Sequence, residues 1–391
     1  MANSLLVTVS GPDQPGITSK LMQVIEQTGD TLEDMGQAVT HGLLSLSFVI
    51  SMKGDDSVLK EMLYHADQMG LVLTHQEVAP LKQDKQSAGE KYILNCVAPT
   101  AISAKFIGDI AQCLATHHVN IHRIDNVQPR HFKALEILTT MPKEAMTKNI
   151  KEELLHISNG HKVDIALLKD NVFRRSKRLI VFDMDSTLIQ TEVIDEMADV
   201  LGVGPEVREI TELAMNGEMN YDESLKMRVS KLKGLKKEQM QEILNRLPLT
   251  PGVEEFVKTV QGLGYKLALI SGGFSFFAQA LKEKLGLDYA FANDLQMIDD
   301  TLTGEVEGVI VNPEQKSMLL KVIAQQEKIS LDQVVAIGDG ANDLPMLATA
   351  GLGIAFHAKD IVKERAQNHM SHGPMTTILY FLGIPGTQNE N

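Results

Sequence analysis

The chain has 391 residues, which is long enough for two or three domains that each bury a core of their own. Hydrophobic residues make up 43%, as in ordinary soluble globular proteins, and the formal net charge of −14 argues against nucleic acid or an anionic membrane as a partner. The chain begins without a basic leader and an apolar segment, and no apolar run approaches about 18 residues, so we expect a cytoplasmic protein.

The first 80 residues predict a unit with the order βαββαβ. Residues 4–11 alternate like a strand, and the loop "GPDQPG" precedes a helical pattern over 17–29 that ends at Gly29, a residue typical of helix caps. Two strands around Gly42, a helix over 56–70 and a strand over 71–78 complete the unit. This order is typical of a two-layer ferredoxin-like sandwich.

The same order of elements recurs over residues 91–170. Strand, helix, two strands, helix and strand are predicted at 91–98, 103–118, 120–128, 131–141, 143–160 and 161–169. The segment 81–90 between the two copies is polar and lacks periodicity, so it is interpreted as a linker. Because of this internal repeat, the first half of the chain is interpreted separately from the second half, whose function is considered on its own.

From Arg178 onward, short apolar strands alternate with helical patterns. The runs "RLIVFD", "YKLALIS", "YAFAN", "VVAIGD" and "LGIAFH" predict a parallel sheet with helices on both faces. In such folds ligands bind beyond the carboxyl ends of the strands. Asp183, Ser271 and Asp339 each end one of these runs, so we expect them to converge.

Asp183 and Asp185 raise the question of why two like charges stand beside a buried strand. A calcium loop is excluded, because it needs Gly at its sixth position and an acid at its twelfth, where this chain has Leu188 and Ile194. An isolated pair of this kind is more often a solvated turn. The interpretation therefore depends on the other strand ends.

Those strand ends carry groups that suit a phosphate and a metal ion. Ser271 precedes a Gly-Gly turn that offers a hydroxyl and backbone N–H groups to an oxyanion. The segment "VVAIGDGANDLPML" supplies Asp339, Asn342 and Asp343, and acidic groups on two strand ends suit a hard cation such as Mg²⁺. A shared divalent cation would remove the repulsion between the carboxylates. Lys316 lies on a helical segment and would on its own be interpreted as a surface lysine.

Together, these motifs resemble those of the haloacid dehalogenase superfamily of aspartyl-phosphate enzymes. Over about residues 178 to 385 they are most similar to the phosphoserine phosphatases. The resemblance implies that Asp183 is the nucleophile that accepts the phosphoryl group and that Asp185 is the general acid and base. The acid needs a raised pKa, whereas the nucleophile must be ionised.

The resemblance also implies the groups that hold substrate and metal. Ser271 binds a phosphoryl oxygen, with further contacts expected at Gly272 and Asn342, and Lys316 neutralises charge between phosphate and nucleophile. Mg²⁺ is expected on Asp183, the backbone carbonyl of Asp185, and Asp339, with Asp343 close by.

Substrate choice is expected to lie in residues 193–250, whose helical pattern interrupts the sheet as a small cap would. The resemblance implies that Glu192 holds the ammonium group of the substrate and Arg228 its carboxylate. Met215 and Tyr221 are expected to contact the substrate as well. Tyr221 stands where the family usually has Phe, and the added hydroxyl is expected to be tolerated.

The two N-terminal repeats resemble ACT domains, which bind amino acids, often across subunit interfaces. The loop with Gly11, Asp13 and Gly16 matches their ligand loop, so an amino-acid effector such as serine and a homodimer are expected. The corresponding "APTAIS" of the second copy lacks the glycines. For that copy a ligand site and a purely structural role both stay open.

Two further groups of residues are interpreted as structural. The histidines of "HHVNIH", His117, His118 and His122, predict an exposed helix-to-strand junction, because no carboxylate or cysteine completes a metal site. Cys96 and Cys113 are the only cysteines, which leaves neither a disulfide framework nor a cysteine-based metal cluster, and both are predicted in the core. The basic run at 174–178 is interpreted as a solvated linker.

The expected protein is an α/β enzyme with a doubly wound, Rossmann-like parallel sheet and a helical cap, preceded by two ferredoxin-like modules. The domain limits are 1–80, a linker at 81–90, 91–170, and 178–391 with the cap at about 193–250. The expected reaction is the Mg²⁺-dependent hydrolysis of O-phospho-L-serine, the last step of serine biosynthesis. Two alternatives stay open: a phosphatase for another small phosphorylated amino or hydroxy acid, and an amino-acid-sensing interaction protein with an inactive phosphatase body.

Overall fold

The computed structural model describes residues 4–52, 57–79, 89–127, 133–142, 148–215 and 218–384. The chain forms two compact units, Met1–Ser87 and Ala88–Asn391, each with its own core. The predicted linker at 81–90 lies almost entirely outside the described residues. No helix in the described part of the chain has the length and apolar character needed to cross a membrane.

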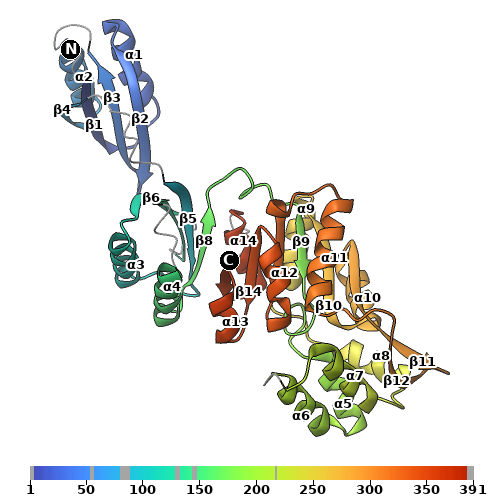
Figure 1. The fold of residues 1–391 in the computed structure, drawn as a ribbon. Coiled ribbons are helices and arrows are strands. Elements are labelled where there is room, and N and C mark those ends of the chain that lie inside the picture. Colours follow the sequence, from blue (N-terminus) through green and yellow to red (C-terminus); the bar gives the residue numbers. More distant parts are fainter. Residues whose placement is uncertain are drawn as a thin grey trace. The chain divides into compact units, whose positions relative to one another are not determined.

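The first unit is a four-stranded antiparallel sheet with two helices on one face (Figure 1). Alternate strand residues such as Leu5, Val7 and Val9 point to α1 and α2, and this alternation encodes the two-layer fold. Gly29 ends α1 in the left-handed conformation, as predicted, with φ 71°. The elements are β1 (Ser4–Pro12), α1 (Ile17–Thr28), β2 (Thr31–Thr40), β3 (Leu43–Ser51), α2 (Ser57–Gln68) and β4 (Val72–Val78), with strand order β2-β3-β1-β4.

The second module repeats this order but is covered on both faces of its sheet. One face packs on its two helices, and the other contributes Val97, Ala134, Ala166 and Leu168 to the core of the domain that follows. The second copy is therefore part of the larger unit. The elements are β5 (Glu90–Val97), α3 (Ala104–Thr116), β6 (Asn120–Asn126), β7 (Ala134–Met141), α4 (Lys148–His161) and β8 (Asp164–Lys169), with strand order β6-β7-β5-β8.

The basic run at 174–178 differs from its prediction as a solvated linker. Arg174 is only 5% exposed and forms an ion pair with Glu136 of β7, and Lys177 donates a hydrogen bond to the backbone carbonyl of Asp332. A buried charge is tolerated only when it has a partner, and each of these two has one. The sequence pattern does not show which distant residue is the partner. The run thus contacts both the second module, through Arg174, and the domain that follows, through Lys177.

The histidine-rich junction also differs from its prediction. His118 and His122 are exposed, as expected, but His117 is half-buried beside Cys113 and Glu153, the cysteine and carboxylate that the sequence pattern did not supply. Cys113 lies one helical turn before His117, and Glu153 comes from the neighbouring helix α4. Both cysteines are buried and free, which confirms their predicted place in the core.

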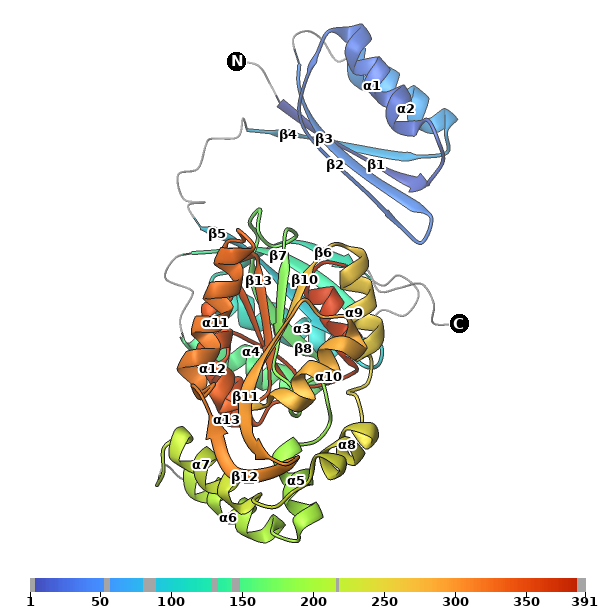
Figure 2. The same ribbon diagram turned by 90° about the vertical axis from the view of Figure 1, so that its right-hand side faces the viewer.

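The remainder of the larger unit contains a seven-stranded sheet between two layers of helices. Figure 2 shows α9 and α10 on one side of the sheet and α11 and α12 on the other. Leu179 and Val181 point to one layer, Ile180 and Phe182 to the other, so the central strand is apolar on both faces. The strands are β9 (Leu179–Phe182), β10 (Lys266–Phe274), β11 (Tyr289–Ile298), β12 (Thr301–Glu307), β13 (Val334–Gly338), β14 (Leu352–Phe356) and β15 (Asn368–Met370), and the helices are α9 (Val253–Gly262), α10 (Ser275–Leu285), α11 (Pro313–Gln326), α12 (Leu344–Thr349), α13 (Asp360–Arg365) and α14 (Ile378–Phe381).

The strand order is β12-β11-β10-β9-β13-β14-β15, and all neighbours are parallel except β11 and β12. These two form a hairpin that the sequence pattern did not predict. Asp299 and Asp300 at its tip both have positive φ, 49° and 54°, as a two-residue hairpin turn requires. Aspartate tolerates this conformation, so the turn carries no glycine signal.

Within the described residues, four helices lie between β9 and α9, where the cap is expected: α5 (Val193–Leu201), α6 (Gly204–Met215), α7 (Tyr221–Lys231) and α8 (Lys237–Arg246). An isolated bridge between Ile189 and Leu249 joins the two segments that connect the cap to the sheet domain. The hairpin β11–β12 reaches the cap, where Thr301 pairs with Lys236 and β12 packs on α7 (Figure 1).

Candidate active site

Three carboxylates meet at the carboxyl ends of two neighbouring strands. Asp183 follows β9 directly, Asp339 follows β13, and Asp343 lies in the short turn after it. The backbone N–H of Asp183 donates to the carbonyl of Ile337 at 2.9 Å, which continues the parallel pairing up to the site. Carboxylate oxygens of Asp183, Asp339 and Asp343 lie within 4.8 Å of one another. The structure thus brings together two segments that are far apart in the sequence, as the strand pattern predicts.

Lys316 is fully buried and bridges two of these carboxylates. Its Nζ lies 2.8 Å from Asp183 Oδ1 and 2.7 Å from Asp343 Oδ1. Burial lowers the pKa of Lys316, but Asp183 and Asp343 raise it more, so the ammonium group stays charged. This one buried cation is thus paired with two of the three carboxyl groups.

The balance of charge around Lys316 fits a divalent cation. Burial and then the charge of Asp183 raise the pKa of Asp339 to about 8 and that of Asp343 to about 7. These groups resist ionisation because they are buried and lie beside another carboxylate. All-oxygen ligands with excess negative charge suit Mg²⁺. Both oxygens of Asp343 are engaged, one by Lys316 and the other by the N–H of Gly340 at 3.0 Å. Asp183 and Asp339 each have one oxygen engaged in this way, by Lys316 and by Thr187, so they are the freer ligands.

Asp185 has surroundings that differ from those of Asp183. Its Oδ1 accepts the N–H of Val193 at 2.9 Å, at the start of cap helix α5. Burial, followed by the charges of Glu192 and Asp183, raises the pKa of Asp185 well above its usual value. The two carboxyl groups are thus poised differently: Asp183 is paired with a cation, and Asp185 is inclined to hold a proton.

The segment Ser271–Gly273 is held by a residue that the sequence reasoning missed. Asn293, which is 1% exposed, donates to the carbonyls of Gly272 at 2.8 Å and Gly273 at 3.3 Å and accepts the N–H of Val311 at 2.7 Å. Ser271 Oγ accepts the N–H of Gly273 at 2.9 Å. The available signal was that Asn293 is the only amide in the apolar run "YAFAN".

Two hydroxyl groups that follow Asp185 were also missed. Ser186 Oγ donates to Glu192 at 2.8 Å, and Thr187 Oγ1 donates to Asp339 at 3.1 Å. Thr187 therefore links the turn after β9 to the carboxylate after β13. Two polar residues directly after the Asp pair were the signal, but a sequence does not reveal which carboxylate each hydroxyl meets.

Three of the residues predicted to bind substrate lie at the start of α5 and on α7. Glu192 precedes α5, Tyr221 begins α7, and Arg228 lies two turns later. Desolvation raises the pKa of Glu192 and of Asp195, and the positive charge of Arg228 opposes the shift at both. Among the described residues Arg228 forms no ion pair, and its Nε donates only to the carbonyl of Ser224, at 3.4 Å. Its guanidinium is thus available to an anion.

Three other predicted residues stand as follows. Met215 is the last residue of α6, and its side chain lies outside the described part of the structure. Asn342 is half-buried in the turn between Asp339 and Asp343. Its Oδ1 occupies space that only a glycine at 340 leaves open, because a Cβ at Gly340 would lie 2.0 Å from it. Tyr221 Oη lies 3.4 Å from the carbonyl oxygen of Gly272, so α7 contacts the Ser271–Gly273 segment.

This contact makes Gly272→Ala informative. A Cβ at Gly272 would lie 2.0 Å from Tyr221 Oη but 3.2 Å from the ring carbon that carries it. We expect Gly272→Ala to lower turnover by about 10²-fold, because the displaced cap or segment spoils the alignment of the site. Adding Tyr221→Phe, which removes the hydroxyl, should restore most of the loss, as steady-state kinetics would show. A double variant as slow as Gly272→Ala would mean that the hydroxyl contact is not the cause of the loss.

The predicted regulatory loop lies in the first unit. Gly11 and Gly16 have positive φ, 156° and 98°, and Gly16 caps α1. The N–H of Asp13 donates to the carbonyl of Gly42 at 2.9 Å, and the Asp13 side chain is exposed. The prediction of a ligand site depends on an open backbone at the start of a helix, and this loop has one. The role of the loop in binding a ligand stays a prediction.

Comparison with known proteins identifies the parts of the chain. Residues 177–351 match the haloacid dehalogenase-like hydrolases, and residues 3–76 and 96–168 each match an ACT domain family. The chain is 35% identical to phosphoserine phosphatase SerB2 of Mycobacterium tuberculosis, over 97% of this chain and 93% of that protein, and 36% identical to a phosphoserine phosphatase of Streptomyces coelicolor, over 99% and 94%.

A solved structure described as a phospho-aspartyl intermediate analogue of phosphoserine phosphatase is also similar. It is 47% identical and has a TM-score of 0.50, and the match covers 53% of this chain and 99% of that one. The predicted fold class, with two ACT-like modules before a haloacid dehalogenase-like domain, is thereby confirmed. The chain belongs to the phosphoserine phosphatase family of haloacid dehalogenase-like hydrolases.

Proposed function

We propose that this protein hydrolyses O-phospho-L-serine to L-serine and phosphate through an aspartyl-phosphate intermediate on Asp183. The observation that carries the proposal is the pair of unlike carboxyl groups after β9. Asp183 lies 2.8 Å from the ammonium group of Lys316, whereas the pKa of Asp185 is raised well above its usual value by burial and by Glu192 and Asp183. Phosphoryl transfer to a carboxylate needs one group of each kind.

In the first step, Asp183 attacks the phosphorus and the bond to the serine oxygen breaks. Lys316 and the hydroxyl and N–H groups of the Ser271–Gly273 segment hold the phosphoryl oxygens, where negative charge spreads in the transition state. Asp185 gives its proton to the departing serine oxygen. In the second step, the same carboxylate takes a proton from water, which attacks the phosphorus and releases phosphate and Asp183.

We propose Mg²⁺ as the metal, held by Asp183, Asp339 and the backbone carbonyl of Asp185, with Asp343 positioning Lys316. When bound, the ion supplies charge compensation for the phosphoryl group and its carboxylate neighbours. Hydrogen bonds from neighbouring groups orient two of the carboxylates near the proposed ion. Thr187 orients Asp339 through a hydrogen bond of 3.1 Å, and Gly340 fixes the second oxygen of Asp343.

Specificity for a phosphorylated amino acid is proposed to come from the cap. Arg228, with no ion pair among the described residues, offers a planar guanidinium to the substrate carboxylate, and Glu192 offers a carboxylate to its ammonium group. Met215, Tyr221, Gly272 and Asn342 are proposed to complete the contacts with the substrate.

Arg228→Lys tests this assignment, because an ammonium group cannot reproduce the bidentate geometry. We expect turnover of phosphoserine to fall by about 10- to 100-fold, the worth of a charge-assisted hydrogen bond, with little change for an aryl phosphate that lacks a carboxylate. Arg208→Lys, on the exposed face of α6, is the matched control and should change neither rate. Equal losses on both substrates would mean that Arg228 serves the structure of the cap.

The experiment that tests the proposed function is a turnover assay of the full chain on a panel of small phosphorylated amino and hydroxy acids. We expect phosphoserine to have the highest kcat/KM, chelation to abolish turnover, and Mg²⁺ to restore it. A better substrate from the panel would favour the alternative phosphatase. Absence of turnover on every ester would favour the alternative of an amino-acid sensor with an inactive body.

We further propose that serine or another amino acid regulates the enzyme through the Gly11–Gly16 loop of the first unit, and that the chain forms a homodimer through its ACT-like modules. The support is the open backbone of this loop at the start of α1. A chain that lacks Met1–Ser87 should retain turnover, because the larger unit has its own core, and should respond less to serine and associate more weakly. An unchanged serine response and unchanged self-association by ultracentrifugation would count against the proposal.

A further inference from the structure

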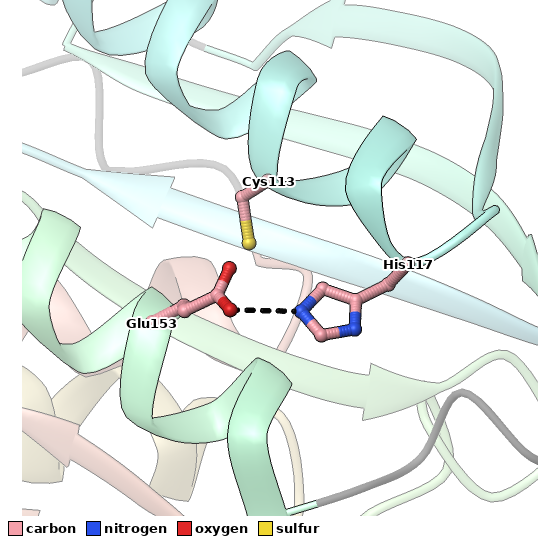
Figure 3. Close-up of side chains that lie close together, drawn as sticks. All are labelled: Cys113, His117 and Glu153. Atoms are coloured by element: carbon pink, nitrogen blue, oxygen red, sulfur yellow. Dashed lines mark ion pairs between the residues drawn. The ribbon is translucent and has the colours of Figure 1, made fainter.

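The second ACT-like module brings a thiol, an imidazole and a carboxylate together on its helical layer. Cys113 lies in the last turns of α3, His117 caps the same helix four residues later, and Glu153 lies on α4. Figure 3 shows the three side chains pointing toward one another, and one ligand atom of each lies within 4.8 Å of the other two. The spacing of four residues puts Cys113 and His117 on one helix face.

The orientation of His117 is a second, independent observation. Its Nε2 is buried and lies 3.1 Å from Glu153 Oε1, yet among the described residues it has no hydrogen bond of good geometry. The ion pair with Glu153 turns this nitrogen toward the carboxylate, but no well-aligned hydrogen bond holds it there. The nitrogen faces the centre of the group formed by the three side chains.

We propose that Cys113, His117 and Glu153 bind a thiophilic divalent transition-metal ion, of which Zn²⁺ is the representative. Sulfur, imidazole nitrogen and carboxylate oxygen are the donors that Zn²⁺ uses in proteins, and three protein ligands leave a fourth position for water. The Glu153 side chain is 47% exposed whereas Cys113 is buried, so an ion can enter past the carboxylate and meet the sulfur inside.

This site differs in chemistry from the carboxylates of the active site. Asp183, Asp339 and Asp343 offer oxygen only and suit a hard cation, whereas a site with Cys113 selects a softer one. An ion on Cys113, His117 and Glu153 would cross-link α3 to α4. It would thereby stabilise the module whose strand β8 packs beside β15 of the phosphatase domain.

Cobalt provides the test, because a thiolate bound to Co²⁺ gives a charge-transfer absorption that oxygen ligands do not give. The full chain, reduced and held in excess Mg²⁺, is titrated with Co²⁺ and then with Zn²⁺. We expect one equivalent of Co²⁺ to produce the absorption and Zn²⁺ to remove it. A folded protein without this absorption would overturn the proposal.

Variants then assign the ligands. Cys113→Ser should abolish the absorption, whereas Cys96→Ser, at the other buried cysteine, should retain it. His117→Asn and Glu153→Gln should each weaken Co²⁺ binding by more than about tenfold, whereas His118→Asn, at the exposed neighbour, should not. Circular dichroism and retained phosphatase activity confirm that each variant is folded. If Cys113→Ser does not fold, the His117 and Glu153 variants decide, and full Co²⁺ affinity in both would refute the site.

Discussion

Asp183→Asn is expected to abolish turnover of every phosphate ester, by more than about 10⁴-fold, whatever the leaving group. The amide cannot form the covalent intermediate, so a better leaving group does not help. Lys316 retains its bond to Asp343 at 2.7 Å, and the exchange removes one of three neighbouring carboxyl groups, so the fold should survive. Rates measured with phosphoserine and with nitrophenyl phosphate check this expectation.

Asp185→Asn should separate the two chemical steps. Turnover of phosphoserine should fall by about 10²–10⁴-fold, the usual contribution of general acid–base catalysis. Nitrophenolate leaves without a proton, so the aryl ester should still phosphorylate Asp183. Without a base to activate water, the enzyme then stalls. The expected result is a burst of about one nitrophenolate per active site followed by a slow steady state.

The two variants control each other. The amide oxygen that Asp185→Asn introduces can still accept the N–H of Val193, so the start of α5 should stay in place. If Asp183→Asn gave the burst and Asp185→Asn gave none, the two roles would be reversed.

Lys316→Met is expected to lower both the stability of the protein and its rate. It removes the one ammonium group between Asp183 and Asp343 and leaves two buried carboxyl groups without their partner. Breaking a buried pair in this way costs about 3–5 kcal/mol of unfolding free energy. Loss of a charge that compensates the transition state should lower kcat by about 10²–10³-fold. Denaturant unfolding and steady-state kinetics measure the two effects.

Mg²⁺ should recover part of the stability of this variant but not its rate, since the ion can offset the carboxylates without replacing the contact to the phosphoryl group. Lys321→Met on the exposed face of α11 is the matched control and should leave both quantities unchanged. A Lys316 variant with full activity would remove this residue from the proposed mechanism.

The meeting of Asp183 and Asp339 at one edge of the sheet could be predicted from the sequence, because it depends only on where the strands end. Asp183, Ser271 and Asp339 each end an apolar run, and the ends of parallel strands share one edge of the sheet. Lys316 is different, since its helix pattern is that of a surface residue and only the family resemblance gives it a role. The structure explains the discrepancy by burying its amine against two carboxylates.

Residues that act through long-range partners escaped prediction. Asn293 holds the Ser271–Gly273 segment, and Arg174 pairs with Glu136 of β7. No periodic pattern in the sequence reports either bond. The group of Cys113, His117 and Glu153 escaped for the same reason, because Glu153 lies on another helix. Periodicity reports on the face of one element, whereas these contacts depend on how two elements pack.

Direct identification of the phosphorylated residue tests whether Asp183 is the nucleophile. The enzyme is mixed with phosphoserine and Mg²⁺ and quenched in acid. Borohydride then reduces the acyl phosphate to an alcohol, and peptide mass spectrometry locates the modified residue. We expect reduction at Asp183 alone, with Asp185 and Asp339 unmodified and no modification in Asp183→Asn. Modification at another carboxylate, or turnover with no reducible intermediate in either the wild-type enzyme or Asp185→Asn, would contradict the proposed mechanism.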